Sequence, residues 1–195
     1  APRAYKPTYL LPATWTDHIN RSPSSPAPGH TELVEQNLKA VEAKYQISLK
    51  ARFSQDLAGS GLGLWGGYTQ SSRWQVYNGA ASRPFRETNY EPELMLVKPL
   101  NLSLFGWDLR LASLSLNHQS NGRALPLSRS WNRVIATLAA ERGDWVVEFR
   151  PWVRITESHT DDDNPDIEDH IGRAELRLGR FTKDHALSLQ LRHSL

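Results

Sequence analysis

The stretch NHQSNGRALPLSRSWN, residues 117–132, contains residue types whose spacing could support nucleophilic catalysis. His118 and Ser120 lie two positions apart, and Asn132 ends the stretch. In such a trio a serine attacks an ester carbonyl, a histidine accepts the serine's proton, and an amide oxygen holds the imidazole in the required tautomer. A polar loop with an incidental histidine is the simpler interpretation of His-x-Ser alone, so the surrounding elements must decide.

The composition sets outer limits on the class of protein. At 195 residues, the chain is long enough for one sizeable domain. A net charge of +2 gives no indication of nucleic-acid binding, and the lack of cysteine excludes disulfides and thiol chemistry. The sequence has no run of about eighteen apolar residues, which argues against a transmembrane helix. A transmembrane β-barrel stays open, because its signal is alternation rather than a continuous apolar run.

Apolar and polar side chains alternate along much of the chain. The pattern is strongest in residues 41–53 and recurs in residues 145–156, 173–178 and 186–192. A helix cannot separate two such sets, because its faces repeat every 3.6 residues, whereas a strand separates them automatically. The sequence therefore predicts an all-β, antiparallel fold of about nine strands. The predicted strands are residues 5–13, 41–53, 61–77, 90–100, 107–118, 130–141, 145–156, 170–181 and 185–195.

Three places depart from a simple strand pattern. Pro7 and Pro12 interrupt the first predicted strand, because proline cannot donate to a sheet ladder. The fifth predicted strand changes parity near residues 112–113, which suggests a β-bulge. The one helical candidate, residues 31–44, overlaps the strongest strand pattern at its far end, so a strand is preferred there.

Two all-β architectures fit this alternation, a soluble sandwich and a transmembrane barrel. The polar faces carry long charged side chains such as Arg150 and Arg154, as in a barrel whose polar face lines the lumen. Outer-membrane barrels also alternate tight turns with long extracellular loops, for which a sandwich gives no reason. The links alternate in this way through most of the chain, short at 101–106, 142–144 and 182–184 and long at 14–40, 78–89, 119–129 and 157–169. The sequence therefore favours the barrel.

The predicted strands form a single domain over residues 1–195 but do not close a barrel. Nine strands is an odd number, whereas single-chain bacterial barrels usually have an even one. The alternation stops in mid-pattern at residues 193–195, and an open sheet edge inside a membrane would leave backbone groups unsatisfied. We therefore expect further strands to follow in the natural protein.

Strand parity places the catalytic candidates on the apolar side of the sheet. His118 and Ser120 share a face with Leu116, and Asn132 shares the apolar face of the next strand with Val134. Residues two apart on a strand lie about 6.6 Å apart, and neighbouring strands bring opposed residues within about 5 Å. Polar groups on a lipid-facing wall are costly and often functional, which favours a catalytic trio near the extracellular strand ends.

Several longer motifs occur along the chain, namely YTQSSRWQ at 68–75, PFRETNYEPEL at 84–94, NHQSNGR at 117–123, SRSWNR at 128–133 and DDNPDI at 162–167. Together and in this order they resemble the outer-membrane phospholipase A family of Gram-negative bacteria. The resemblance covers roughly residues 41–195, with residues 1–40 fitting only loosely. It implies a twelve-stranded transmembrane barrel, of which about three C-terminal strands would lie beyond this chain.

The resemblance implies calcium-dependent hydrolysis of phospholipid acyl esters by a homodimer. The enzyme would be a phospholipase A1/A2 of the bacterial outer membrane, with its active site at the extracellular leaflet. By motif position, Ser120 is the nucleophile, His118 the base and Asn132 the orienting residue. Gly122 would donate its backbone N–H to the oxyanion.

The same resemblance assigns oxygen ligands to calcium, a hard cation that binds oxygen. The Arg123 carbonyl and the Ser128 hydroxyl would come from one protomer, and Ser82 from its partner. Asp163 matches an acid associated with a second calcium position, for which the alternative is a solvated acidic loop. This chain has Leu125 where the family often has an acidic residue, which counts against any calcium site at that position.

Gln70 matches a polar residue buried at the family's dimer interface, and for Gln70 and Ser82 the alternative is ordinary polarity of a wall and a loop. Two rival functions remain beside the lipolytic enzyme. One is a non-enzymatic pore or structural barrel of the outer membrane, and the other is a soluble β-sandwich that binds a ligand. Detergent-dependent folding would exclude the sandwich, and phospholipid hydrolysis that is lost in Ser120→Ala would exclude the passive barrel.

Overall fold

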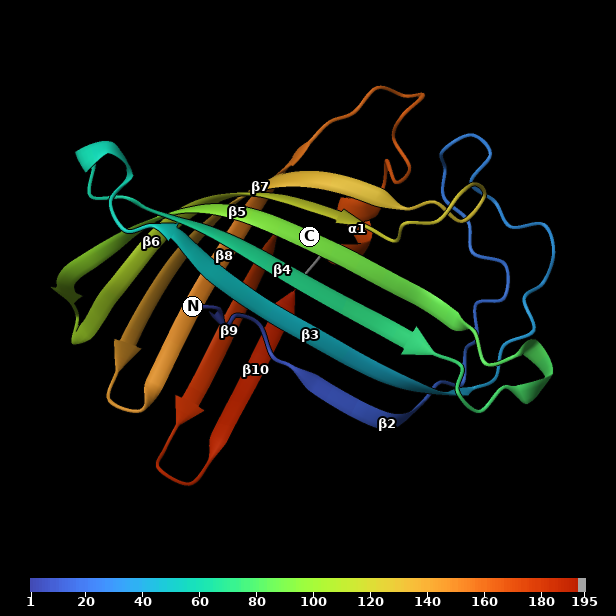
Figure 1. Ribbon diagram of the computed structural model, residues 1–195, viewed down its shortest axis with the longest axis horizontal. Coiled ribbons are helices and arrows are strands. Elements are labelled where there is room, and N and C mark those ends of the chain that lie inside the picture. Colours follow the sequence, from blue (N-terminus) through green and yellow to red (C-terminus); the bar gives the residue numbers. More distant parts are fainter. Residues whose placement is uncertain (193–195) are drawn as a thin grey trace.

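The computed structural model describes residues 1–192, which form one curled antiparallel sheet (Figure 1). The strands are β1 (Arg3–Ala4), β2 (Tyr9–Trp15), β3 (Val41–Ser54), β4 (Gly63–Trp74), β5 (Phe85–Leu104), β6 (Trp107–Ser120), β7 (Ser130–Arg142), β8 (Trp145–Ile155), β9 (Ala174–Phe181) and β10 (Ala186–Arg192). From β3 to β10 each strand pairs with the next, and β1 and β2 both pair with β3. The prediction of an all-β antiparallel fold is confirmed, and a single curled sheet replaces the sandwich alternative.

Three short helices lie in the links, two 3-10 turns at Leu57–Gly59 and Gly79–Ala81 and helix α1 at Ile167–Ile171. No helix within residues 1–192 combines the length and the apolar character needed to span a membrane. Residues 193–195, the end of the last predicted strand, lie outside the described residues.

The sheet buries charged side chains on its inner face and exposes apolar side chains on its outer face, which is the reverse of a soluble domain. Inside the curl, Glu93 and Arg150 are only 5% and 3% exposed. On the outer face, Leu116 is 56% exposed and Val153 is 71% exposed. Other exposed apolar residues of the outer face include Ile47, Leu49, Leu114, Phe149 and Leu189. Apolar surface exposed over so many neighbouring strands is typical of a wall that contacts lipid.

Short and long links alternate through most of the chain, as the sequence predicts, although the 55–62 link is nearly as long as the 121–129 link. Figure 1 shows the long links 16–40, 75–84, 121–129 and 156–173 gathered at one end of the sheet and the links 55–62, 105–106, 143–144 and 182–185 at the other. The link predicted at 101–106 is shorter than expected, because β5 continues to Leu104. Phe105 and Gly106 both have positive φ, 52° and 77°, which matches the tight hairpin turn that a twisted strand pair favours.

The first predicted strand, residues 5–13, is wrong as a continuous element. It divides into β1 and β2, because the chain leaves the ladder between Tyr5 and Thr8. Pro7 has no N–H to donate there, and side chains replace the missing ladder bonds. The Lys6 N–H donates to Ser48 Oγ at 3.1 Å, and the Ser48 N–H donates to Thr8 Oγ1 at 3.2 Å. The detour directs Tyr5 and Lys6 into the curled sheet, where their partners lie.

Two further boundaries differ from the prediction. Residues 31–40 contain no helix, so the helical alternative at 31–44 is wrong, and the strand pattern from Val41 onward prevails. The strand predicted from residue 170 begins at Ala174. Before it, helix α1 packs Ile167 and Ile171 against a buried cluster of Trp131, Ile135 and Trp152. The spacing of those two isoleucines by four residues was the available signal for this helix turn.

The parity change in β6 is present, but its position is earlier than predicted. The pairing of β6 with β7 shifts register between Leu109 and Leu111, which leaves Arg110 unpaired. A shift of one residue moves the side chains that follow to the opposite face. The bulge therefore places His118 and Ser120 on the outer face, in line with Leu114 and Leu116.

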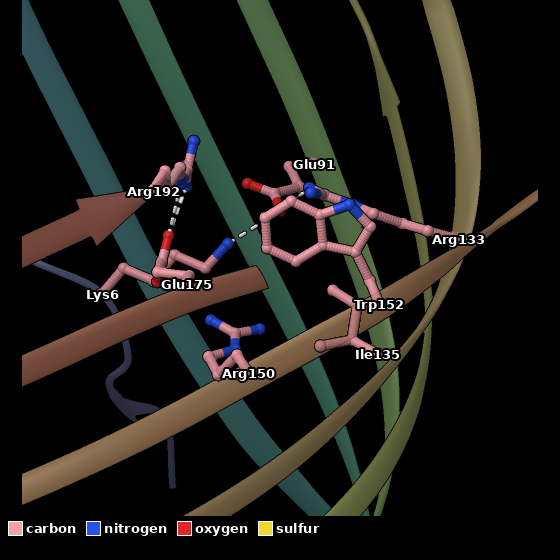
Figure 2. Close-up of a pocket in the computed structure, with 8 residues that line it drawn as sticks. All are labelled: Lys6, Glu91, Arg133, Ile135, Arg150, Trp152, Glu175 and Arg192. Carbon is pink, nitrogen blue, oxygen red and sulfur yellow. Dashed lines mark hydrogen bonds and ion pairs between the residues drawn. The ribbon is translucent and has the colours of Figure 1, made fainter. Parts of the chain in front are cut away.

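Paired charges fill the inside of the curl. Glu93 accepts hydrogen bonds from Ser115 Oγ at 2.7 Å and Tyr5 Oη at 3.0 Å and forms an ion pair with Arg150 at 3.1 Å. Glu91 lies 2.8 Å from Lys6 Nζ and 3.0 Å from Arg133 Nη2. Figure 2 shows a small cavity beside these ion pairs, lined by Lys6, Glu91, Arg133, Ile135, Arg150, Trp152, Glu175 and Arg192. The pairs join the N-terminal segment to β5 and, through the two glutamates, to β7 and β8.

This interior predicts a large difference between two otherwise similar substitutions. Glu93→Gln leaves the buried Arg150 without its counter-ion, so we expect the free energy of unfolding to fall by about 3 kcal/mol. Glu141 forms an ion pair with Arg110 at 2.5 Å on the exposed surface, where Glu141→Gln should cost less than about 1 kcal/mol. Urea unfolding of the protein folded in lipid vesicles measures both. Equal effects of the two substitutions would contradict this account of the interior.

Candidate active site

His118 and Asn132 meet across the β6–β7 pair. The two residues are directly opposed in the register, and His118 Nδ1 lies 2.7 Å from Asn132 Oδ1. Both side chains belong to the outer face, where His118 is exposed and Asn132 is half-buried. The structure therefore brings together the predicted base and the predicted orienting residue.

Ser120 is the last residue of β6 and lies on the same face as His118. It is half-buried, and its register partners are Tyr90 on β5 and Ser130 on β7. Among the described residues, no hydrogen bond joins Ser120 to His118. Two positions on a strand are about 6.6 Å apart along it, and such contacts often tighten only when substrate is bound. The trio shares one wall, although its serine–histidine contact is not formed.

Asn132 has a second partner, which the sequence analysis missed. Its Nδ2 donates a hydrogen bond to Oε1 of Glu157, in the link between β8 and β9. The signal was present in the strand parity, because Ile155 is opposed to Asn132 and Glu157 follows two positions later on the same face. The predicted orienting residue is therefore held between an imidazole and a carboxylate.

Gly122 is the second residue of the 121–129 link, with φ at +64°. A Cβ at this position would lie 3.1 Å from the Tyr90 ring, so both conformation and space favour glycine. Asn121 is buried beside it and fixes the loop. Its Oδ1 accepts from the N–H groups of Arg123 at 3.2 Å and Arg129 at 3.0 Å, and its Nδ2 donates to the Leu127 carbonyl at 2.7 Å. The role of Gly122 as oxyanion donor stays a prediction.

Asp163 gathers hydroxyl groups and a histidine at the end of the sheet. Ser128 Oγ and Ser130 Oγ donate to its Oδ2 at 2.7 and 2.9 Å, and His30 Nε2 lies 2.8 Å from its Oδ1. Ser25 Oγ donates to the Asp163 carbonyl at 2.6 Å. Burial acts to raise the pKa of Asp163, but the hydrogen bonds from Ser128, His30 and Ser130 outweigh it and lower the pKa. The cluster anchors the 16–40 link to the 156–173 link.

The oxygen atoms of this cluster fit a calcium ion, although they do not form a complete site. No three His, Cys, Asp or Glu side chains within residues 1–192 gather closely enough to hold a metal. Ser128 Oγ and the Asp163 carboxylate are adjacent, and both are oxygen ligands of the kind that calcium accepts. Leu125 is 61% exposed and has no side-chain oxygen to add. Hydroxyl, carboxylate and backbone carbonyl groups would have to complete the coordination.

The two candidates predicted at a dimer interface, Ser82 and Gln70, lie apart from the trio. Ser82 caps the 3-10 turn of the 75–84 link with φ at 55°, and in the described part of the chain no hydrogen bond joins it to another candidate. Gln70 lies on the outer face of β4, opposed to Ile47 and Tyr90, and its Oε1 accepts from Tyr68 Oη at 3.3 Å. Their predicted roles at a dimer interface stay predictions.

The Arg123 side chain is anchored at the first residue of β5. Its Nη2 donates to the Phe85 carbonyl at 3.2 Å, and its N–H is held by Asn121. The loop that carries the Arg123 carbonyl is thus fixed at both the backbone and the side chain. Its predicted role as a calcium ligand is not tested by this arrangement.

Comparison with known proteins identifies a family. The model of the phospholipase A1 family matches residues 2–195, so the likeness extends into the N-terminal segment that motif resemblance fitted only loosely. A putative phospholipase A1 of Neisseria meningitidis serogroup B is 42% identical over 182 residues, which cover 90% of this chain and 47% of the relative. Phospholipase A1 of Escherichia coli strain K12 is 42% identical over 153 residues, which cover 78% and 52%. The chain spans about half the length of these relatives.

Solved structures show the same fold. Outer membrane phospholipase A from Escherichia coli superposes with a TM-score of 0.84 at 37% identity, covering 98% of this chain and 71% of that one. An outer membrane phospholipase of Salmonella typhi, crystallised as a dimer with bound calcium, superposes with a TM-score of 0.83 at 38% identity, covering 97% and 71%.

The lowered pKa of Asp163 predicts that the 16–40 link is held in a pH-dependent way. Such a carboxylate contributes stability above its unfolded-state pKa, about 3.9, and the contribution is lost as the pH falls through the lower folded value. With calcium chelated, we expect Asp163→Asn to lower the hydrogen-exchange protection of the 16–40 link at neutral pH. The difference should shrink as the pH falls below about 4. Asp161→Asn, at an exposed acid of the 156–173 link that also carries Asp163, is the control, and a difference that grows in acid would contradict the assignment.

Proposed function

Because this chain belongs to the phospholipase A1 family, we propose that it hydrolyses the acyl esters of phospholipids in the bacterial outer membrane, with Ser120, His118 and Asn132 as its catalytic triad. The observation that carries this proposal is the 2.7 Å contact between His118 Nδ1 and Asn132 Oδ1 on the exposed outer face. That contact leaves Nε2 of the same ring available to Ser120. An apolar wall that carries a polar trio brings the nucleophile to lipid without a soluble cleft.

The proposed reaction proceeds through an acyl-enzyme. Ser120 Oγ attacks the ester carbonyl carbon while His118 Nε2 takes the hydroxyl proton. The tetrahedral intermediate carries an oxyanion, toward which the Gly122 N–H would donate. When the intermediate collapses, the C–O bond of the ester breaks and His118 returns the proton to the leaving lysophospholipid alkoxide. Water, deprotonated by His118, then attacks the acyl carbon; the bond to Ser120 Oγ breaks, His118 returns the proton to Ser120, and the fatty acid is released.

The outer face supports binding of the acyl chains. Leu94 on β5 is opposed to Leu116 on β6, and Leu116 is opposed to Val134 on β7. Leu94 and Leu116 are 47% and 56% exposed. They form an apolar row on the wall below His118, so an acyl chain that follows the wall would bring its ester to the strand ends. The site would then work at the extracellular leaflet.

The proposed reaction includes a calcium ion, which the oxygen atoms near Ser128 and Asp163 would help to bind. Ser128 and the Arg123 carbonyl would hold the ion beside the oxyanion, and Asp163 would serve a second position or keep Ser128 oriented. A bound calcium ion would supply positive charge that stabilises the oxyanion. One protomer offers too few ligands, since calcium takes six to eight oxygens. We therefore propose that the ligand set is completed on dimerisation.

The dimer would form through the wall that carries the site. Gln70 is an amide on an otherwise apolar outer face, and polar groups there are costly unless they are covered. An isologous contact would bring the partner's Ser82 to the calcium of each protomer and make two sites at once. An enzyme surrounded by its substrate would thus stay incomplete until two protomers meet. A relative of Salmonella typhi was crystallised as a dimer with bound calcium, which supports the general link between the dimer and calcium.

A pore or structural barrel is the alternative function. The buried ion pairs inside the curl argue against a water-filled passage there, because Arg133 and Arg150 occupy it with their counter-ions. A purely structural barrel would give no reason for a histidine and an amide to meet on the outer wall.

Removal of each triad member should reveal a hierarchy. Ser120→Ala and His118→Ala should each lower phospholipid hydrolysis by at least about 1000-fold, because serine and histidine act as a unit. Asn132→Ala should keep more activity, since a neutral orienting group contributes less than the nucleophile. Release of fatty acid from phospholipid vesicles measures all three. A folded Asn132→Ala protein as inactive as Ser120→Ala would show that the assigned roles are wrong.

Ser82→Ala tests the dimeric calcium site. Because calcium would bind well only in the dimer, calcium and dimerisation should each strengthen the other. We expect Ser82→Ala to weaken both the calcium dependence of hydrolysis and calcium-induced dimerisation, followed by chemical cross-linking, without loss of folding. Ser103→Ala, at the opposite end of the sheet, is a matched control. A protein held monomeric that hydrolyses phospholipid at full rate with calcium chelated would refute the dimer proposal.

A further inference from the structure

Glu157 occupies a place behind the triad that the catalytic proposal does not use. It follows the end of β8 by two positions, so strand parity continues the outward row of Val153 and Ile155. Its Oε1 accepts the hydrogen bond from Asn132 Nδ2, while Asn132 Oδ1 contacts His118. Three side chains from three segments thus form one hydrogen-bonded row on the outer wall.

We propose that Glu157 is a positioning residue that sets the orientation of the Asn132 amide and, through it, the tautomer of His118. This inference rests on the proposed hydrolytic function. An ionised carboxylate can only accept hydrogen bonds, so the amide edge that faces Glu157 must be the NH2 group. The carbonyl edge is then left facing His118. The same row with the amide reversed would place two acceptors against each other.

The orientation of the amide decides which imidazole nitrogen is the base. A carbonyl facing Nδ1 requires that Nδ1 carry the proton, which leaves the lone pair of Nε2 free to accept the proton of Ser120. A reversed amide would donate its N–H to Nδ1 instead and favour the tautomer protonated at Nε2. That tautomer cannot act as a base toward Ser120. The amide oxygen and nitrogen are nearly equal in size, so steric fit alone would not choose between the two orientations.

Glu157 also adds the charge that an asparagine lacks. His118 becomes a cation when it takes the serine proton, and an orienting aspartate would stabilise that cation directly. Here the neutral amide lies between the imidazole and the carboxylate, and polarised hydrogen bonds in a row strengthen one another. The negative charge of Glu157 is one side chain further away than that of an aspartate, so its contribution should be smaller.

The competing explanation is that Glu157 only anchors the 156–173 link to β7. In that case its removal would loosen the link or lower stability but would leave the histidine tautomer unchanged. The two roles differ in what responds to substitution. Positioning changes kcat and the imidazole tautomer, whereas anchoring alone changes folding or loop order.

The experiment uses the full-length natural protein in its calcium-bound, dimeric state. Glu157→Ala and Glu157→Gln should lower kcat about 10-fold with KM unchanged, by analogy with other groups that orient a functional histidine. Glu157→Asp, which keeps the charge, should recover part of the loss. Asp161→Asn removes an exposed charge from the same link and should leave kcat as it is. Intact folding of every variant is checked by circular dichroism.

A double-mutant cycle asks whether Glu157 acts through Asn132. In an Asn132→Ala background, Glu157→Ala should change kcat by no more than about twofold, because the group through which it acts is missing. An undiminished Glu157→Ala effect in that background would overturn the proposal. A folded Glu157→Ala protein with wild-type kcat would also overturn the proposal, provided that Ser120→Ala is inactive and the proposed hydrolytic function therefore stands. Full hydrolysis by Ser120→Ala would instead remove the proposed function itself.

The tautomer of His118 can be measured independently of enzymatic activity. In protein labelled with 15N-histidine, nuclear magnetic resonance distinguishes a ring protonated at Nδ1 from one protonated at Nε2. We expect His118 to be protonated at Nδ1 in the wild-type protein and to show a mixture in Glu157→Ala. A ring protonated at Nδ1 to the same extent in both proteins would overturn the inference.

Discussion

Every charge that faces the inside of the curled sheet must find a partner there, and the rest of the structure depends on that constraint. Glu93 with Arg150 connects β5 to β8, and Glu91 with Arg133 connects β5 to β7, so these ion pairs link strands that are not neighbours in the sheet and form together with its curvature. A single unpaired charge at such a site would cost several kcal/mol. Successive side chains of a strand point to opposite faces, so when the polar side chains point into the curl, the apolar side chains between them point outward. The wall that faces lipid is therefore a consequence of the paired interior.

The proposed site is the polar exception on this apolar outer wall. His118 and Asn132 interrupt an apolar row, and their contact depends on two features of the backbone. The bulge at Arg110 sets which face His118 occupies, and the β6–β7 register sets which residue it meets. The positions of His118 and Asn132 are therefore set by the backbone of the β6–β7 strand pair. Its less regular components, Gly122 and the cluster around Asp163, lie in the links, where hydrogen bonds from buried side chains take the place of sheet pairing.

How far the sequence could predict this structure depends on the range of the interactions involved. The alternation in residues 41–53 is local, and it was enough to predict a strand and its outward face. The shared face of His118 and Asn132 followed from parity on two adjacent strands, whereas their direct opposition is set by the β6–β7 register. Contacts between distant segments were not predictable in that way. His30 meets Asp163 only because two links fold together at one end of the sheet, and nothing in the sequence near either residue indicates the contact. Parity extended by one residue would have placed Glu157 on this face, but Glu157 lies just beyond the predicted strand 145–156.

The central claim is that Ser120 is a nucleophile that meets its substrate on the outer wall. It is tested most directly by covalent labelling with a long-chain alkyl fluorophosphonate, which reacts with an activated serine and resembles an acyl ester. The account predicts that mass spectrometry finds the label on Ser120, that hydrolysis declines in step with labelling, and that His118→Ala leaves the serine unlabelled. Loss of hydrolysis with the label on a different residue, or full hydrolysis by protein whose Ser120 is completely modified, would contradict it.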